Sequence, residues 1–203
     1  MGAMWADYSL GRPGGAALAA AGFTGVIRYV GISVSSKRLT AAEYTDLIGN
    51  GLSVLGVVES TISEADNGYD AGVADAQAAL ADIDVITSGQ GLPFVFAVND
   101  KPTYIQADVD YVRGFRDVFG GTTGAYGFTK FLAAIQIEGI ASVYWQCGIQ
   151  PTGDSGVHLW QRNGSDGAPT QVTVNGAVCD ITDQLLPLTV PCITQTNFML
   201  LEG

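Results

Sequence analysis

Apolar and polar positions follow two alternating periods along most of the chain. Short apolar runs typical of buried strands are each followed by a segment whose apolar residues recur at helical spacing. The expected strands cover residues 4–7, 25–30, 52–60, 92–100, 123–128 and 141–148, and the expected helices cover 14–22, 39–51, 70–86, 106–120 and 129–139. Repeated strand–helix units predict a parallel sheet covered by helices.

The pattern changes in the last quarter of the chain. The segment VHLWQR at 157–162 predicts a strand, but no helical spacing follows it. Asn163-Gly164 and Asn175-Gly176 are turn dipeptides, and the apolar residues beside them predict short strands at 170–174 and 177–182. This part of the chain is therefore expected to be hairpin-like rather than another strand–helix unit.

About eight strands and five helices predict an α/β fold, a small and irregular (β/α)8 barrel of the TIM type with a hairpin-like last quarter. A doubly wound open sheet is the alternative, although no GxGxxG segment follows the first strand. The 203 residues are enough for one large core. We expect a barrel domain over 1–187 and a C-terminal tail or linker over 188–203.

Composition and charge exclude several classes of function. The net charge is −11 and the nine Lys and Arg residues form no basic cluster, so nucleic acid is not an expected partner. Every apolar run is shorter than the roughly 20 residues of a spanning helix, so membrane insertion is not expected. The start of the sequence shows no Sec-type signal peptide, so a wall-acting protein would be phage-encoded or exported by another route.

The cysteines and loops give no sign of a bound metal or cofactor. Cys147, Cys179 and Cys192 contain no CxxC pair, which argues against a zinc site and a dense disulfide framework. One disulfide is the alternative to three buried, inert thiols, and we favour the thiols. The loop GRPGG lacks the Lys-Ser/Thr of a P-loop. We therefore expect neither a metal nor an organic cofactor.

Polar side chains gather where the expected strands end. In a barrel the carboxyl ends of parallel strands meet at one face, and that face carries the active site. Carboxyl groups in different surroundings can serve glycoside cleavage as acid and base, and aromatic rings and amides bind sugars. The candidate catalytic residues are Asp7, Glu59, Asp100 and Asp180. The candidate substrate-binding residues are Arg28, Asn99, Tyr126, Trp145, Trp160 and Gln161.

Structural roles compete with this interpretation. A carboxylate at a strand end is often a helix cap or a turn former, and the tryptophans could equally be core residues. Arg28 could pair structurally with Asp7 or Glu59, and Thr40 and Glu43 are expected to form a capping box at the start of a helix. Four acidic residues near expected helix ends are interpreted as solvated surface: Asp82, Asp84, Asp108 and Asp110.

Four segments form a recognisable combination: DYSLGRPGGAALAAAGFTGVIRYVG, KRLTAAEYTDLIGNGLSVLGVVE, GYDAGVADAQAAL and PFVFAVND. Together they resemble the glycoside-hydrolase-like domain of actinobacteria and their phages, over roughly residues 5–185. That domain is related in fold to the Chalaropsis-type lysozymes of glycoside hydrolase family 25. The segment HLWQ followed by a late Asp is similar to the closing strands of those lysozymes.

The resemblance implies a barrel with a modified end and a site at its C-terminal mouth. It matches Asp7 to the Asp of the first strand, Asp180 to the Asp of the last strand, and Glu59 to an acidic or polar end of the third strand. The lysozymes carry Asp-x-Glu after the fourth strand, and the glycoside-hydrolase-like domains carry Ala-Val-Asp. Here the chain has Ala-Val-Asn-Asp, so Asn99 is a departure and Asp100 is the candidate acid.

The hypothesis is a cell-wall glycan hydrolase, either the lysozyme-like domain of a phage endolysin or an actinobacterial wall enzyme. It would cleave the β-1,4 bond next to N-acetylmuramic acid, with Asp100 or Glu59 as the acid and with Asp7 and Asp180 either stabilising positive charge or orienting the neighbouring acetamido group. The alternative is an inactive glycan-binding barrel that positions a phage tail or lysin on the wall, or a structural virion domain. The expected partner is bacterial cell-wall glycan, with an additional wall-binding or virion domain.

Overall fold

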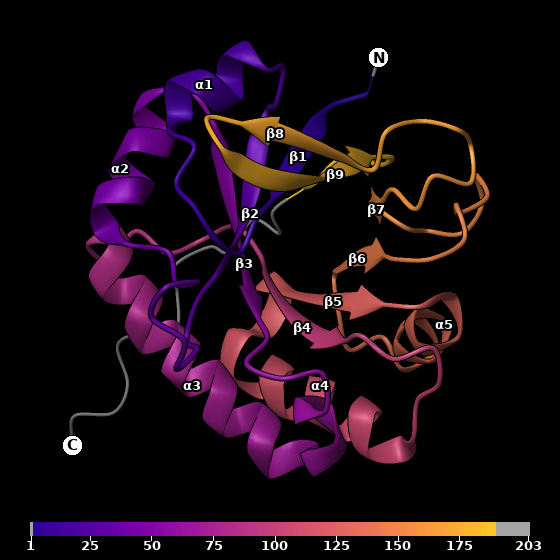
Figure 1. Ribbon diagram of the computed structural model, residues 1–203. Coiled ribbons are helices and arrows are strands. Elements are labelled where there is room, and N and C mark those ends of the chain that lie inside the picture. Colours follow the sequence, from indigo (N-terminus) through magenta and orange to yellow (C-terminus); the bar gives the residue numbers. More distant parts are fainter. Residues whose placement is uncertain (1, 190–203) are drawn as a thin grey trace.

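The computed structural model describes residues 2–189, which form a closed barrel with one further strand outside it (Figure 1). The strands are β1 (Met4–Asp7), β2 (Gly25–Tyr29), β3 (Ser53–Val58), β4 (Val95–Asn99), β5 (Thr123–Gly127), β6 (Val143–Gln146), β7 (Leu159–Gln161), β8 (Gln171–Val174) and β9 (Ala177–Gln184). The helices are α1 (Gly15–Ala20), α2 (Ala41–Gly49), α3 (Gly68–Thr87), α4 (Gln106–Phe119) and α5 (Thr129–Glu138). Short 3₁₀ turns cover Glu64–Asn67 and Gly120–Thr122.

The barrel is closed by a strand that runs against the others. Strands β1 to β7 follow one another in sequence order and pair in parallel. Strand β9 pairs antiparallel with both β7 and β1, and β8 pairs with β9 alone in the described sheet. The predicted barrel is therefore confirmed, and the open-sheet alternative is wrong because β1 has a neighbour on each side.

The hairpin-like end of the chain is also confirmed. Asn175 and Gly176 join β8 to β9 with φ angles of 47° and 80°. Both residues of a type I′ turn need positive φ, which is why the Asn-Gly dipeptide carried a usable signal. Strand β9 extends two residues beyond the predicted end at 182, because its far half pairs with both β1 and β7.

The helices cover only part of the barrel. Helices α1, α2 and α3 lie along the left of the view, α4 at its lower end and α5 at its lower right, whereas β7, β8 and β9 are joined by loops (Figure 1). Helices α3 and α4 approach closely at two glycines. A Cβ on Gly72 would lie 2.0 Å from the carbonyl oxygen of Tyr111, and one on Gly114 would lie 2.1 Å from that of Tyr69.

Aromatic side chains fill the barrel interior beneath the mouth. The ring of Phe96 on β4 meets Trp145 on β6 edge-on at 5.5 Å, and Tyr126 on β5 lies 4.3 Å from the same indole. Gly124 on β5 leaves the room that Phe96 occupies, since a Cβ there would lie 2.5 Å from that ring. The barrel is thus a packed core that supports the mouth from below.

The start of α2 differs from the prediction in one respect. Thr40 caps the helix, and its side chain accepts a hydrogen bond from the Glu43 amide. The Glu43 carboxylate does not close the predicted capping box. It turns inward and accepts hydrogen bonds from Arg28 and Tyr8 instead. A buried guanidinium competes for a carboxylate more strongly than a single backbone amide does.

Two of the four acidic residues expected at the surface are structural. Asp108 is fully buried, and its carboxylate accepts a hydrogen bond from the Ile105 amide at the start of α4. Asp82 accepts one from the Gly31 amide and pairs with Arg38. Asp108 thus caps its own helix from the N3 position, whereas Asp82 binds the loop after β2.

Cys147 and Cys179 are free and buried, as expected of inert thiols. Cys192 and the expected tail from residue 190 onward lie outside the described residues. Within residues 2–189, no helix is both long enough and apolar enough to span a bilayer.

Candidate active site

A cavity of about 180 Å³ opens at the C-terminal mouth of the barrel. All four candidate catalytic carboxyls line it, and three of the six candidate binding residues join them. Its walls are Asp7, Tyr29, Val57, Glu59, Val98, Asp100, Tyr126, Trp145, Gln161 and Asp180. The sequence prediction that carboxyls from separate strands share one site is met by this geometry.

Three of the carboxyls reach the mouth because the parallel strands all end there. Asp7 is the last residue of β1, while Glu59 and Asp100 each directly follow the last residue of β3 and β4. Asp180 arrives differently. It lies in the middle of β9, and the antiparallel register places it directly opposite Asp7.

Side-chain alternation decides which predicted residues reach the cavity. Successive residues of a strand point to opposite faces of the sheet, so only every second one faces the barrel interior. Val98 and Asp100 face inward, and Asn99 between them faces outward. The same rule turns Arg28 and Trp160 outward beside the inward-facing Tyr29 and Gln161. The three predictions that placed Arg28, Asn99 and Trp160 against the substrate are therefore corrected.

Arg28 is held behind the barrel wall by a buried network. It is fully buried, and its Nε donates to Glu43 Oε1 at 2.9 Å. Its terminal nitrogens donate to the carbonyl oxygens of Tyr8 and Lys37, and its guanidinium carbon lies 4.2 Å from the centre of the Tyr8 ring. Arg28 thus pairs with Glu43, rather than with Asp7 or Glu59 as the sequence suggested.

Asn99 and Trp160 are structural for the same reason. Asn99 is fully buried, and its side-chain oxygen accepts a hydrogen bond from the Lys101 amide. The Trp160 indole is 1 % exposed and donates to the Gly148 carbonyl oxygen at 3.3 Å. Each side chain packs the outer layer of the barrel, beyond the reach of a molecule in the cavity.

Tyr29 is a wall residue that the sequence prediction missed. Its hydroxyl donates to Glu59 Oε2 at 3.3 Å, and the Lys37 ammonium lies 5.4 Å from the centre of its ring. The alternation rule could have found it, because Arg28 and Tyr29 are adjacent on β2 and cannot both face inward. On the opposite wall, the Tyr126 hydroxyl donates to Gln161 Oε1 at 2.6 Å.

Asp7 is the carboxyl whose ionisation is most perturbed. Burial and the neighbouring charges of Asp180 and Glu59 raise its pKa, Arg28 and Lys37 lower it, and the net result is a pKa of about 7 instead of 3.8. The charge of Asp180, which lies directly opposite Asp7 on the paired strand, disfavours the ionised form of Asp7. Asp7 therefore holds its proton close to neutral pH, which suits proton transfer at that pH.

The two carboxyls that follow β3 and β4 are perturbed in the same direction. Burial raises the pKa of Glu59, and the charge of Asp100 adds to the effect. Burial also raises the pKa of Asp100. Asp180 is half-buried, and its Oδ1 accepts a hydrogen bond from Gln171 Nε2 at 2.7 Å. The mouth therefore offers carboxyl groups in different surroundings, as glycoside chemistry requires.

Two polar atoms of the cavity wall have no hydrogen-bond partner within the described part of the chain. They are Asp7 Oδ1 and Trp145 Nε1, and their side chains are 7 % and 2 % exposed as residues. A buried polar atom without a partner costs about 1–3 kcal/mol. The residues that line this cavity thus include one unpaired acceptor atom and one unpaired donor atom.

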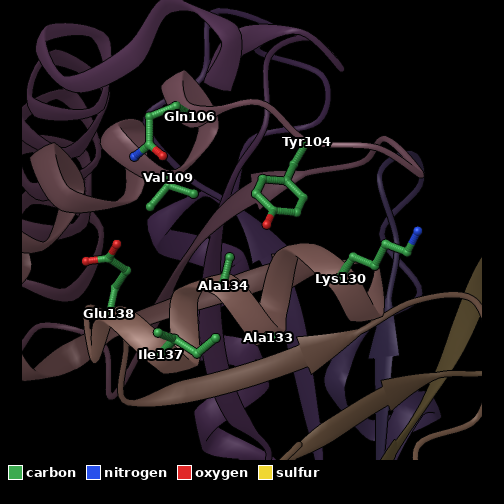
Figure 2. Close-up of a pocket in the computed structure, with 8 residues that line it drawn as sticks. All are labelled: Tyr104, Gln106, Val109, Lys130, Ala133, Ala134, Ile137 and Glu138. Atoms are coloured by element: carbon green, nitrogen blue, oxygen red, sulfur yellow. The ribbon is translucent and has the colours of Figure 1, made fainter.

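Within residues 2–189, no group of three or more His, Cys, Asp or Glu side chains is arranged to hold a metal ion. A larger cavity of about 400 Å³ lies outside the barrel, with Tyr104 and Gln106 facing the Ala134 and Ile137 side of α5 (Figure 2). None of the predicted catalytic or binding residues lines it.

Comparison with known proteins places this barrel among glycoside-hydrolase-like domains. The sequence model described as "Rv2525c-like, glycoside hydrolase-like domain" matches residues 16–173. The Tat-secreted protein Rv2525c of Mycobacterium tuberculosis, crystallised with L-tartrate, has a TM-score of 0.79 at 23 % identity. That alignment covers 94 % of this chain and 98 % of Rv2525c. No curated protein sequence matches the chain.

Two cell-wall enzymes share the fold at lower identity. The bacterial lysozyme from Streptomyces coelicolor has a TM-score of 0.60 at 13 % identity, over 91 % of this chain and 92 % of the lysozyme. The modular autolysin LytC from Streptococcus pneumoniae, solved with a synthetic peptidoglycan ligand, has a TM-score of 0.61 at 14 % identity. The alignment covers 89 % of this chain and 46 % of LytC. At these identities the likeness establishes the irregular barrel fold.

Proposed function

This chain belongs to the Rv2525c-like, glycoside hydrolase-like domain family, and on that basis we propose that it hydrolyses a β-1,4 glycosidic bond in bacterial peptidoglycan. The observation that carries the proposal is the meeting of four carboxyls in one cavity, with Asp7 protonated near neutral pH opposite Asp180. The likeness to a lysozyme and to an autolysin solved with a peptidoglycan ligand supports the choice of substrate.

In the proposed reaction, Asp7 donates its proton to the glycosidic oxygen as the bond to the anomeric carbon breaks. Positive charge that develops on the sugar is stabilised by the carboxyl groups of Asp180 and Glu59. A water molecule then adds to the anomeric carbon, and its proton returns to Asp7. Gln161 and Tyr126 hydrogen-bond the sugar, and the edge of Trp145 contacts it from below.

The choice of Asp7 as the acid departs from the assignment that the sequence favoured. Asp100 and Glu59 are the candidates by position, and the pKa of each is raised by burial. Asp7 is the more deeply buried group, and its pKa of about 7 is the best matched to proton donation at neutral pH. Substitution of Asp7, Asp100 and Glu59 in turn therefore distinguishes the acid from the other two carboxyls.

The proposed place of action is the bacterial cell wall. The same chemistry would serve a phage endolysin or an actinobacterial wall enzyme, and either would combine this barrel with a further wall-binding or virion domain. Nucleic acid is not a proposed partner, because the net charge is −11.

One observation favours a second function, a glycan-binding barrel without catalysis. Asn99 occupies a position where related domains carry an acid, and here it is buried and faces away from the cavity. Asp100 is therefore the single carboxyl that the end of the fourth strand contributes to the cavity. A barrel of this kind would keep its sugar contacts and lose turnover.

The test is release of reducing ends from purified actinobacterial peptidoglycan. Wild-type protein is compared with Asp7→Asn, Asp100→Asn and Glu59→Gln, and with Asp84→Asn as a matched control. Asp84 is exposed near the far end of α3, and its substitution makes the same chemical change away from the mouth. Release that is lost in Asp7→Asn and kept in Asp84→Asn supports hydrolysis with Asp7 as the acid.

Other outcomes separate the alternatives. Release abolished by Asp100→Asn or Glu59→Gln, with Asp7→Asn still active, would keep the hydrolase and move the acid. Wild-type protein that sediments with the wall and releases nothing would support the binding barrel and contradict hydrolysis.

A further inference from the structure

The cavity at the barrel mouth carries a strong imbalance of charge. Four carboxyls line it, and no Lys, Arg or His side chain is among its described walls. The two nearby cations are Arg28, which lies behind the wall, and Lys37, which lies beside the Tyr29 ring. The three guanidinium nitrogens of Arg28 are already committed to Glu43 and to two backbone carbonyls.

A second, independent feature points to a ligand. Asp7 lines the cavity with only 7 % of the residue exposed, and its Oδ1 has no hydrogen-bond partner among the described residues. A bound N–H or O–H donor would satisfy this atom, and a positively charged donor would do so most strongly. Trp145 Nε1 is also unpartnered, so the same ligand should present an acceptor oxygen.

Two alternative cationic ligands fit less well. A metal ion needs several oxygens at short and regular distances, and the described carboxyls are not grouped in that way. A long basic peptide side chain would bring charge, but not the hydroxyl oxygens that Trp145, Gln161 and Tyr126 are placed to meet. The cavity of about 180 Å³ is also smaller than the roughly 300–1,000 Å³ of a drug-sized site. A single sugar ring matches this volume.

We propose that this cavity selects a sugar that carries a free ammonium group, such as a glucosamine unit that has lost its N-acetyl group. The ammonium lies against Asp7 and Asp180, and the ring hydroxyls meet Gln161, Tyr126 and Trp145. An acetamido group would present one neutral N–H to several carboxylates, and a sugar acid would be repelled. This inference rests on the proposed function in taking the ligand to be a wall glycan.

Binding should depend on pH in both directions. Below about pH 7 Asp7 gains its proton, so its attraction for the ammonium declines. Above the pKa of the sugar ammonium the ligand itself becomes neutral. The charges facing Asp7 are Asp180 on β9, Glu59 after β3, Arg28 on β2 and Lys37 in the loop after β2. Affinity should therefore peak close to neutral pH.

The experiment is a calorimetric titration of the wild-type protein with three oligosaccharides of equal length. These are the tetramers of β-1,4-linked glucosamine, of N-acetylglucosamine and, as the anionic arm, of galacturonic acid. We expect the glucosamine tetramer to bind about tenfold more tightly than the N-acetylated one at neutral pH and low salt. The preference should shrink when the salt is raised to about 1 M, where screening acts over roughly 3 Å.

Substitutions test which residues produce the preference for the glucosamine tetramer. Asp180→Asn keeps an oxygen that can accept the Gln171 hydrogen bond, and it should lose most of the preference, whereas the control Asp84→Asn should keep it. Should Asp180→Asn fail to fold, the salt and pH dependence of the wild type still decides the case. Equal affinity for the two glucosamine-derived tetramers, tighter binding of the N-acetylated or anionic tetramer, or no binding of any would overturn the inference.

The proposed function can fail separately. Release of reducing ends from peptidoglycan by a protein without amine preference would keep the hydrolase and overturn the selectivity. Amine preference in a protein that releases nothing would support the selectivity and contradict hydrolysis.

Discussion

The two sides of the barrel build the same mouth by different means. On the helical side, each parallel strand ends at the mouth, and a carboxyl at the strand end reaches the cavity when its position in the strand faces inward. On the side of β7 to β9, Asp180 lies in mid-strand and reaches the cavity only because β9 runs backwards against β1. The first side positions its residues by topology, and the second positions them by register.

The two sides also differ in how deeply their ion pairs are buried. Behind the helical side, Arg28 is fully buried and paired with Glu43. On the antiparallel side, Arg162 pairs through two nitrogens with Asp183, and both side chains retain contact with solvent, with 17 % and 23 % of their surfaces exposed. A buried pair is expensive to break, and an exposed pair contributes little.

The largest expected effect comes from the residue at which the two sides meet. Asp7→Asn removes the proposed proton donor, so reducing-end release should fall by roughly 10²–10⁴-fold. Asp180→Asn leaves that donor in place but removes a charge that raises its pKa. The activity profile of Asp180→Asn should therefore shift to lower pH, which a rate-against-pH series would measure. An unshifted profile would contradict the coupling across β1 and β9.

Asp7→Asn should lower activity, but it should raise the free energy of unfolding at pH 8. The folded-state pKa of Asp7 is raised from 3.8 to about 7, so its contribution to stability is complete below about pH 4 and declines as pH rises towards 7. Asp7→Asn has no such decline and should be more stable than wild type at pH 8, by up to roughly 4 kcal/mol. Urea unfolding at pH 4 and pH 8 would check this, and a variant less stable at pH 8 would contradict it.

The ion pairs give the next largest effect. Glu43→Gln leaves Arg28 buried without its partner charge and should cost about 3–5 kcal/mol of unfolding free energy. Asp183→Asn, the matched change on the antiparallel side, should cost about 1 kcal/mol or less. Chemical denaturation of the two variants compares them directly. Equal losses would show that burial does not distinguish the two pairs.

Two glycines are expected to have smaller effects than Glu43→Gln. Gly72→Ala forces a Cβ against the Tyr111 carbonyl between α3 and α4 and should cost about 1–3 kcal/mol. Gly176→Ala meets nothing within 4 Å, and its cost of about 1 kcal/mol comes from a φ of 80° in the hairpin turn. In thermal unfolding, Gly72→Ala should have a lower melting temperature than Gly176→Ala. The reverse order would mean that α3 and α4 move apart to relieve the clash at a lower cost than that of placing alanine at a positive φ in the turn.

Much of the helical side could be predicted from sequence because its signals are local. Strand and helix periods located the elements from β1 to α5, and a strand-end rule brought Asp7, Glu59 and Asp100 together at the mouth. The errors there were also local in origin. Arg28 and Asn99 were placed in the site because strand ends were considered without deciding which residues of each strand face inward.

The sequence by itself determined the barrel, its hairpin end and the set of acidic strand ends, since each depends on periodicity or on turn residues close together in the chain. Only the tertiary structure decided that Asp180 lies opposite Asp7, that Glu43 leaves its helix cap for Arg28, and that Asp7 keeps its proton near pH 7. These facts depend on strand register, burial and the distance between charges. Each of those quantities joins residues far apart in the chain, and no local pattern of residues records them.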